Sequence, residues 1–151
     1  MKEYLREATK EDIDLLFKWT NDPIVRSNSF SSKKITYEEH VKWYKSLLEN
    51  ENCRQYIYMC DDCPIGQIRI VQKEKDAEIS YSICEDNRSK GYGTKLLELI
   101  KTQAFHDFPS VDKLVGLVKM DNCASKKAFK NAGYEEKYSV FEFLRVDKGN
   151  G

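Results

Sequence analysis

The stretch Arg88-Ser89-Lys90-Gly91-Tyr92-Gly93 lies where the sequence changes from the pattern of a strand to that of a helix. Residues 77–84 before it (AEISYSIC) alternate apolar and polar side chains, which predicts a half-buried strand. Apolar residues after it recur at helical spacing and predict a helix over 89–106: Leu96, Leu97, Ile100, Ala104 and Phe105. Glycines at such a junction permit a sharp turn and the close approach of a ligand.

This junction has the properties of a phosphate-binding loop. The first turn of a helix leaves backbone N–H groups without internal partners and carries the positive end of the helix dipole. Arg88 and Lys90 add two cationic side chains. The spacing differs from the nucleotide P-loop, which ends in Gly-Lys-Ser/Thr, and from the dinucleotide fingerprint, which needs a third glycine. An ordinary Gly-rich turn before a surface helix is the alternative.

The loop and two later segments resemble the GNAT acetyltransferase superfamily, in which Q/R-x-x-G-x-G/A loops hold the pyrophosphate of acetyl-coenzyme A. A short predicted strand at 113–118 is followed by Asn122-Cys123-Ala124-Ser125, which is similar to the family's N-x-x-S helix start. Ala132-Gly133-Tyr134 resembles the glycine and aromatic residue that close this motif in the family. The matching pieces stand in the family's order.

The resemblance implies an α/β (α+β) fold with a mixed, mostly antiparallel sheet of six to seven strands, flanked by about four helices. It also implies that the strands at 77–84 and 113–118 splay apart around the cofactor. The remaining strands are expected at 4–6, 54–60 and 64–72, with a closing strand at 138–146 whose residues alternate.

Capping residues predict where the helices begin and end. Thr9 starts a helix that ends at Asn21-Asp22-Pro23, because the residue before proline is forced out of helical geometry. A polar loop is expected over 27–34, and Thr36 and Glu39 form a T-x-x-E capping box for the next helix. A final helix is expected at 123–131.

Length and charge restrict the class of protein. We expect a single domain over residues 1–151. Lys+Arg and Asp+Glu both number 25, and this zero net charge argues against a nucleic-acid-binding protein. No apolar run suits a signal peptide or a membrane span. We therefore expect a cytoplasmic enzyme without nucleic-acid or membrane partners, and a homodimer is possible.

The five cysteines are an odd set at irregular spacing, typical of reduced thiols rather than of a disulfide framework. Cys60-Asp61-Asp62-Cys63 has a spacing that can bind zinc or carry out redox chemistry. No second pair or suitably placed histidine accompanies it, and its flanks have the pattern of two strands. We interpret it as a hairpin turn and expect no metal site.

The resemblance assigns acetyl-CoA as the co-substrate and implies which residues contact it. A backbone N–H near Ile83 or Cys84 is the expected donor to the oxyanion that develops on the thioester. The full predicted set comprises Ile83, Cys84, Arg88, Ser89, Lys90, Gly91, Tyr92, Gly93, Thr94, Asn122 and Ser125.

Acetyl transfer to an amine also needs a general base and a proton for the thiolate. Glu78 resembles the general base of the histone-acetyltransferase branch, although a strand carboxylate can equally anchor substrate or aid solubility. Many family members carry a proton-donating tyrosine four residues after the serine of N-x-x-S, but Phe129 occupies that position here. The candidates to replace it are Ser125, Tyr134 and Tyr138, or solvent. Direct transfer is favoured over a cysteine intermediate, because no histidine shows a pairing with a cysteine.

The acceptor is expected to contact the first two long helices, their connecting loop and the C-terminal segment. The predicted contacts are Trp19, Arg26, Phe30, His40 and Tyr138. These regions resemble N-acetyltransferases of nucleotide-linked amino sugars, which we favour, and those of ribosomal-protein N-termini. Packing in the core is the alternative for Trp19, a surface position for Arg26, and a hydrogen-bonded helix position for His40. A non-catalytic acyl-CoA-binding module is a third possibility.

Overall fold

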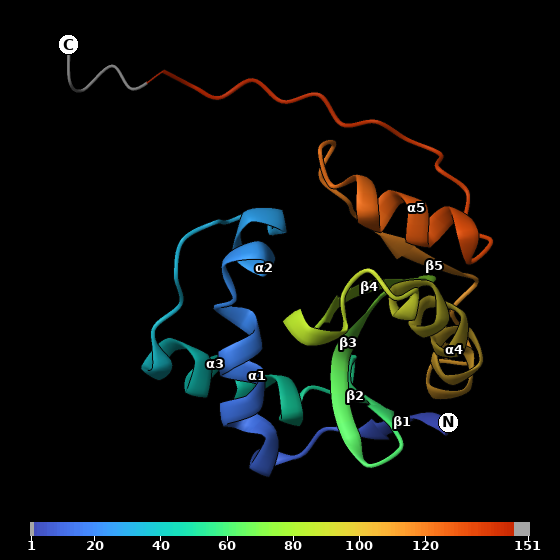
Figure 1. Cartoon of the computed structure of the whole chain (residues 1–151). Helices are drawn as coiled ribbons and strands as arrows, with labels where there is room; N and C mark the ends of the chain where they lie inside the picture. Colours follow the sequence, from blue (N-terminus) through green and yellow to red (C-terminus); the bar gives the residue numbers. More distant parts are fainter. Residues whose placement is uncertain (1, 147–151) are drawn as a thin grey trace.

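The computed structural model describes residues 2–146 and consists of one sheet with helices on both faces (Figure 1). Within this range the sheet has five strands in the order β1-β2-β3-β4-β5. An antiparallel series is formed by β1 (Glu3–Glu7), β2 (Cys53–Cys60), β3 (Cys63–Lys73) and β4 (Asp76–Ile83), and β5 (Lys113–Gly116) runs parallel to β4. The mixed α/β fold class is confirmed.

Two apolar clusters hold the helices to the two faces of the sheet. Because side chains alternate along a strand, Tyr58 of β2 faces α4 (Tyr92–Asp107) and α5 (Cys123–Asn131). Its neighbour Ile57 faces α1 (Ile13–Thr20) and α3 (Tyr37–Glu49) on the other side. Both side chains are fully buried. The sheet therefore separates a layer of α1 and α3 from a layer of α4 and α5.

The predicted caps form at the first two long helices. The backbone N–H of Thr9 donates to Asp12 Oδ2 at 2.8 Å, which completes a capping box around the short 3-10 helix η1 (Lys10–Asp12) ahead of α1. Thr36 Oγ1 accepts from the backbone N–H of Glu39 at 3.2 Å at the start of α3. These hydrogen bonds satisfy N–H groups that a helix start leaves unpaired.

A further helix, α2 (Pro23–Asn28), was not predicted. The prediction that α1 ends before Pro23 is correct, but the same residues also begin a helix. Asp22 Oδ1 accepts from the backbone N–H of Ile24 at 2.9 Å, and proline at the first helical position lacks an N–H that would need a partner. The following loop turns back toward α3.

β4 and β5 diverge after a short region of pairing. Their register couples Asp76–Ile79 to Lys113–Gly116, and beyond it β4 continues to Ile83 while β5 has ended. The predicted splay of these two strands is therefore present. The strand expected at 113–118 is shorter because the chain leaves the sheet after Gly116.

The C-terminal strand expected at 138–146 is not formed. Residues 135–146 have no regular secondary structure and run past α5 and away from the sheet (Figure 1). Phe141 is 94% exposed and Phe143 93%. The alternating pattern is present, but no neighbouring strand is available to it in the single chain, so the sheet has fewer strands than expected.

The hairpin interpretation of Cys60-Asp61-Asp62-Cys63 is correct, since Cys60 pairs with Cys63 across the β2–β3 turn. None of the five cysteines, all within the described range, forms a disulfide. No helix among residues 2–146 has the length and apolar character needed to cross a membrane. The same residues contain no cluster of three or more His, Cys, Asp or Glu side chains suited to a metal ion.

Candidate active site

A cleft of about 970 Å³ opens where β4 and β5 diverge. Its walls are α2 with the following loop on one side, and the start of α4 with α5 on the other. The floor includes residues 78–83 of β4. Side chains from α2, the loop before α4 and the start of α5 line this region. Elements far apart in the sequence thus meet around one space.

The predicted phosphate loop forms one end of the cleft. Ser89 and Gly91 adopt left-handed backbone conformations, with φ of 63° and 84°. Because these residues form a turn, α4 begins at Tyr92 rather than at residue 89. No side chain among the described residues caps the α4 N-terminus, and Gly93 and Thr94 of its first turn line the cleft. Uncapped N–H groups and the helix dipole fit a diphosphate here.

Gly91 permits the backbone turn at this end of the cleft. A side-chain methyl at Gly91 would meet no atom within 4 Å, so its glycine is needed for backbone conformation rather than for packing. Ser89, Tyr92, Asn122 and Ser125 also line the cleft, as the prediction required, whereas Lys90 is exposed and outside its lining. The residues present therefore fit the diphosphate of coenzyme A.

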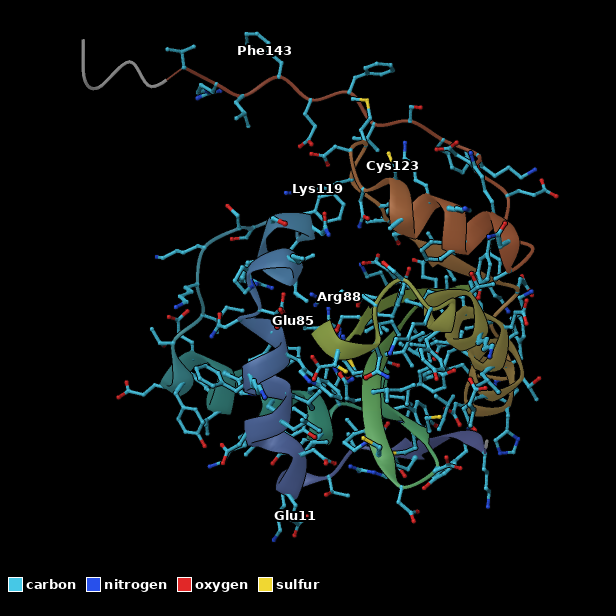
Figure 2. All side chains as sticks on the ribbon, in the orientation of Figure 1. Glu11, Glu85, Arg88, Lys119, Cys123 and Phe143 are labelled. Carbon is cyan, nitrogen blue, oxygen red and sulfur yellow. The ribbon has the colours of Figure 1, made fainter. Side chains whose placement is uncertain are left out.

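Arg88 connects the loop to α2. Its Nε donates to the carbonyl oxygen of Ile83 at 3.0 Å, and a second guanidinium nitrogen lies 3.1 Å from Asp22 Oδ2. Burial alone would raise the pKa of Asp22, but hydrogen bonds from Arg88 and from the N–H of Ile24 hold that pKa below its usual value. Figure 2 labels Arg88 between α2 and the start of α4. Arg88 thus positions two walls of the cleft.

The two backbone N–H groups predicted as oxyanion donors, those of Ile83 and Cys84, point in different directions. The N–H of Cys84 donates to the carbonyl oxygen of Ile65 at 2.8 Å, so this N–H belongs to the β3–β4 pairing and does not fit the oxyanion role. Successive residues of a strand direct their N–H groups to opposite edges. Ile83 therefore directs its N–H toward the opening between β4 and β5, and it lines the cleft. Cys84 does not line the cleft, and its Sγ lies 3.0 Å from Asn87 Oδ1.

Glu78 lies in the cleft on the face of the sheet that carries α1 and α3. Its Oε2 accepts from Lys73 Nζ at 2.8 Å, in a largely solvent-exposed ion pair. Ser80 and Ser82 follow Glu78 on the same face, as strand alternation predicts. This carboxylate is accessible from the cleft.

A tyrosine that the sequence analysis did not select supplies a hydroxyl group beside Phe129. Tyr81 Oη lies 3.0 Å from Ser125 Oγ, and the Tyr81 ring makes an edge-on contact with Phe129 at 5.9 Å between centroids. Burial raises the pKa of Tyr81, so this hydroxyl stays protonated at neutral pH. Sequence alternation placed Tyr81 on the core side of β4, and only the packing of α5 reveals the contact with Ser125.

Tyr134 lies outside the cleft, contrary to its predicted role as an acid. Its hydroxyl donates to the carbonyl oxygen of Leu97 at 2.9 Å, and its ring packs edge-on against Phe129 at 5.1 Å. Burial raises the pKa of Tyr134 well above its ordinary value. The residue anchors the end of α5 to α4, which leaves its hydroxyl committed to the backbone.

Two predicted acceptor contacts are core residues. Trp19 is 9% exposed and packs in the cluster between α1, α3 and the sheet. His40 is 1% exposed, and its Nε2 lies 3.0 Å from the carbonyl oxygen of Ile13. Burial lowers the pKa of His40. Neither lines the cleft, because the helical faces that carry them turn toward the sheet.

The other acceptor candidates divide between the cleft and the tail. Phe30 and Arg26 line the cleft, and Tyr138 is 82% exposed on the tail, outside it. The Arg26 guanidinium is engaged by the end of α1 and by the loop after α2: it donates to the carbonyl oxygens of Thr20, Ser31 and Lys33 and to Ser29 Oγ. Arg26 therefore shapes this wall, and most of its N–H donors are engaged within the protein.

The sequence analysis missed two further basic residues, of which Arg69 lines the cleft. Arg69 of β3 lines the floor with its guanidinium 5.1 Å from the ring centroid of Trp43. Lys119, in the loop after β5, donates to the carbonyl oxygen of Ser27 at 2.9 Å and joins that loop to α2 (Figure 2). Neither residue belongs to a motif. Arg69 pairs with Ser80 across β3 and β4, so the two side chains lie on one face of the sheet.

Comparison with known proteins agrees with this geometry. Residues 4–135 match the family described as "Acetyltransferase (GNAT) domain". The chain is 32% identical over 124 residues to "Acetyltransferase PseH" of Campylobacter jejuni, covering 82% of this chain and 76% of the relative. PseH of a second C. jejuni strain is 30% identical over 125 residues, with the same coverage.

Solved structures share the fold. The aminoglycoside acetyltransferase AAC(6')-Ib in complex with paromomycin and acetyl-CoA superimposes with a TM-score of 0.80 at 21% identity, covering 93% of this chain and 86% of that one. Spermidine N-acetyltransferase from Vibrio cholerae, in complex with CoA and spermine, gives a TM-score of 0.83 at 16% identity, covering 96% and 88%.

Proposed function

Since this chain belongs to the GNAT acetyltransferase family and is an acetyl-CoA-dependent N-acetyltransferase, we propose that its acceptor is a nucleotide-linked amino sugar. The observation that carries this proposal is the polar floor of the cleft. Glu78, Ser80 and Ser82 of β4 and Arg69 of β3 lie on one face, next to the opening between β4 and β5. An amino sugar offers hydroxyl groups to such a surface, and a nucleotide offers phosphates to a cation.

The catalytic steps follow from the placement of these residues. Acetyl-CoA supplies the thioester, and the N–H groups at the start of α4 bind its diphosphate. The N–H of Ile83 stabilises the oxyanion that develops on the thioester carbonyl. Glu78, directly or through water, accepts the proton that the attacking amine loses.

Proton return to the thiolate is the function we assign to the Tyr81–Ser125 pair. Phe129 has no hydroxyl group at the position where the family carries a tyrosine. Tyr81 Oη, 3.0 Å from Ser125 Oγ, places two hydroxyl groups in the same part of the cleft. Like any tyrosine with a pKa at or above its ordinary value, Tyr81 carries a proton at neutral pH that it can donate.

The experiment is an acceptor screen with acetyl-CoA and a thiol-release readout. Its arms are nucleotide-linked amino sugars, the same sugars without the nucleotide, peptides with free N-termini, an aminoglycoside and spermidine. The proposal expects the largest kcat/KM for a nucleotide-linked sugar. Turnover of peptides without turnover of sugars would favour an N-terminal acetyltransferase and reject the proposal.

Three broader features belong to the same proposal. One domain over 1–151 is supported by the family match over residues 4–135. A cytoplasmic location is supported by cysteines without a disulfide. A homodimer is supported by the exposed apolar side chains of residues 138–146, which a monomer would leave in water.

A further inference from the structure

Arg69 occupies an unusual position for a cation. It lies in the middle of β3, paired with Ser80 of β4, on the face that carries α1 and α3. Its guanidinium is positioned over the Trp43 ring at 5.1 Å from the centroid, and it lines the cleft. A cation over an indole ring is stabilised by the ring's electron-rich face, and its orientation is restricted.

The charge of Arg69 is not directly paired with a carboxylate among residues 2–146. Burial lowers the pKa of Arg69, and the nearby Cys53 and Glu78 partly oppose this shift. Within residues 2–146 this guanidinium makes no ion pair or hydrogen bond, and the neighbouring carboxylate, Glu78, is engaged by Lys73 at 2.8 Å. No buried side-chain nitrogen in that range lacks a partner, so the Arg69 nitrogens reach the solvent in the cleft.

We propose that Arg69, held by Trp43, binds a phosphate of the acceptor at the floor of the cleft. This inference rests on the proposed function and deepens it. Val71, two residues after Arg69, pairs with Glu78 across the β3–β4 ladder, so Arg69 and Glu78 are diagonal neighbours on one face, roughly 7–8 Å apart at the backbone. An acceptor that carries an amine and a phosphate on one sugar can reach both residues.

The neighbouring polar side chains support the same orientation. Gln55 Nε2 donates to Gln67 Oε1 at 2.7 Å, and Gln67 Nε2 donates to Ser82 Oγ at 3.0 Å. This network fixes the side chains across three strands beside Arg69. A bidentate guanidinium–phosphate contact needs such a preorganised surface, because its geometry is specific.

The test compares Arg69→Gln with Arg54→Gln. Arg54 is a matched control because its guanidinium lies 5.4 Å from the Phe108 ring centroid, and it is outside the cleft lining. The first measurement is UDP binding by calorimetry, with CoA saturating so that the loop before α4 is occupied. Arg69→Gln should weaken UDP binding about 10-fold to 100-fold, and Arg54→Gln should leave it unchanged.

The second measurement is KM for a nucleotide-linked amino sugar and for the same sugar without the nucleotide. Arg69→Gln should raise the first KM about 10-fold to 100-fold and leave the second unchanged. If wild type binds UDP through Arg69 but acetylates no nucleotide-linked sugar, the anion site stands and the proposed acceptor fails. If Arg69→Gln binds UDP as wild type does, the inference is overturned whatever the activity.

Discussion

Gly116, the last residue of β5, lies directly beneath the Phe129 ring. A methyl group at this position would come within 2.6 Å of Cε1 and 3.1 Å of Cε2 of Phe129. Both distances are shorter than van der Waals contact, so Gly116→Ala forces the ring to move. Phe129 also packs edge-on against Tyr81 and Tyr134 at 5.9 and 5.1 Å, which leaves the ring little room.

The expected cost follows from this crowding. Overpacking a core by one methyl group typically costs about 1–3 kcal/mol. For a domain of this length each kcal/mol lowers Tm by about 2–4 °C, so Gly116→Ala should lower Tm by roughly 2–12 °C. Because Phe129 supports the Tyr81 ring, kcat should also fall.

The assay is thermal unfolding with a rescue variant. Phe129→Leu removes the ring atoms nearest to Gly116, so the pair Gly116→Ala/Phe129→Leu should lose less stability than the sum of the two single changes. The reasoning is refuted if Gly116→Ala keeps the wild-type Tm, or if the two changes are strictly additive.

Three other predictions concern the site and its surroundings. Glu78→Gln should lower kcat by about 10²–10⁴-fold, the usual contribution of a general base, while calorimetry shows unchanged CoA binding; equal kcat in both proteins would remove Glu78 from catalysis. Tyr81→Phe should lower kcat with little change in KM for acetyl-CoA. Tyr134→Phe should mainly lower the free energy of unfolding, by about 1 kcal/mol in urea unfolding. A large kcat loss in Tyr134→Phe alone would make Tyr134, and not Tyr81, the proton donor. Burial lowers the pKa of His40 in the folded state, so the unfolded chain takes up the proton first. The free energy of unfolding should therefore fall as the pH drops below about 6.5, and His40→Gln should abolish that part of the pH dependence.

Local signals in the sequence predicted much of this fold. The strand at 77–84, the N-cap at Thr36 and the helix at 123–131 match the structure within a residue or two, because each depends on neighbours in the chain. Of the capping box expected at Thr36, the structure shows the side-chain cap, while Glu39 Oε1 accepts from the Thr36 hydroxyl. α2 was missed because Pro23 was read only as the end of the preceding helix. The strand at 138–146 has the right pattern, but a strand also needs a partner, which no pattern supplies.

The candidate site was predictable only where a motif carries it. Gly91 and Ser125 belong to motifs and line the cleft. Arg26 and His40 were chosen for their chemistry, yet tertiary contacts engage the guanidinium of the first and bury the second. Arg69 belongs to no motif, and its exposure to the cleft depends on how α3 packs over the sheet.

The carboxylate of Asp22 has two tasks at once, since it caps α2 and pairs with Arg88 at 3.1 Å. Any shift of the Arg88 guanidinium weakens its hold on the residue that starts α2, and α2 carries one rim of the cleft. Loss of the Asp22 carboxylate would therefore remove the cap of α2 and the partner of Arg88 together.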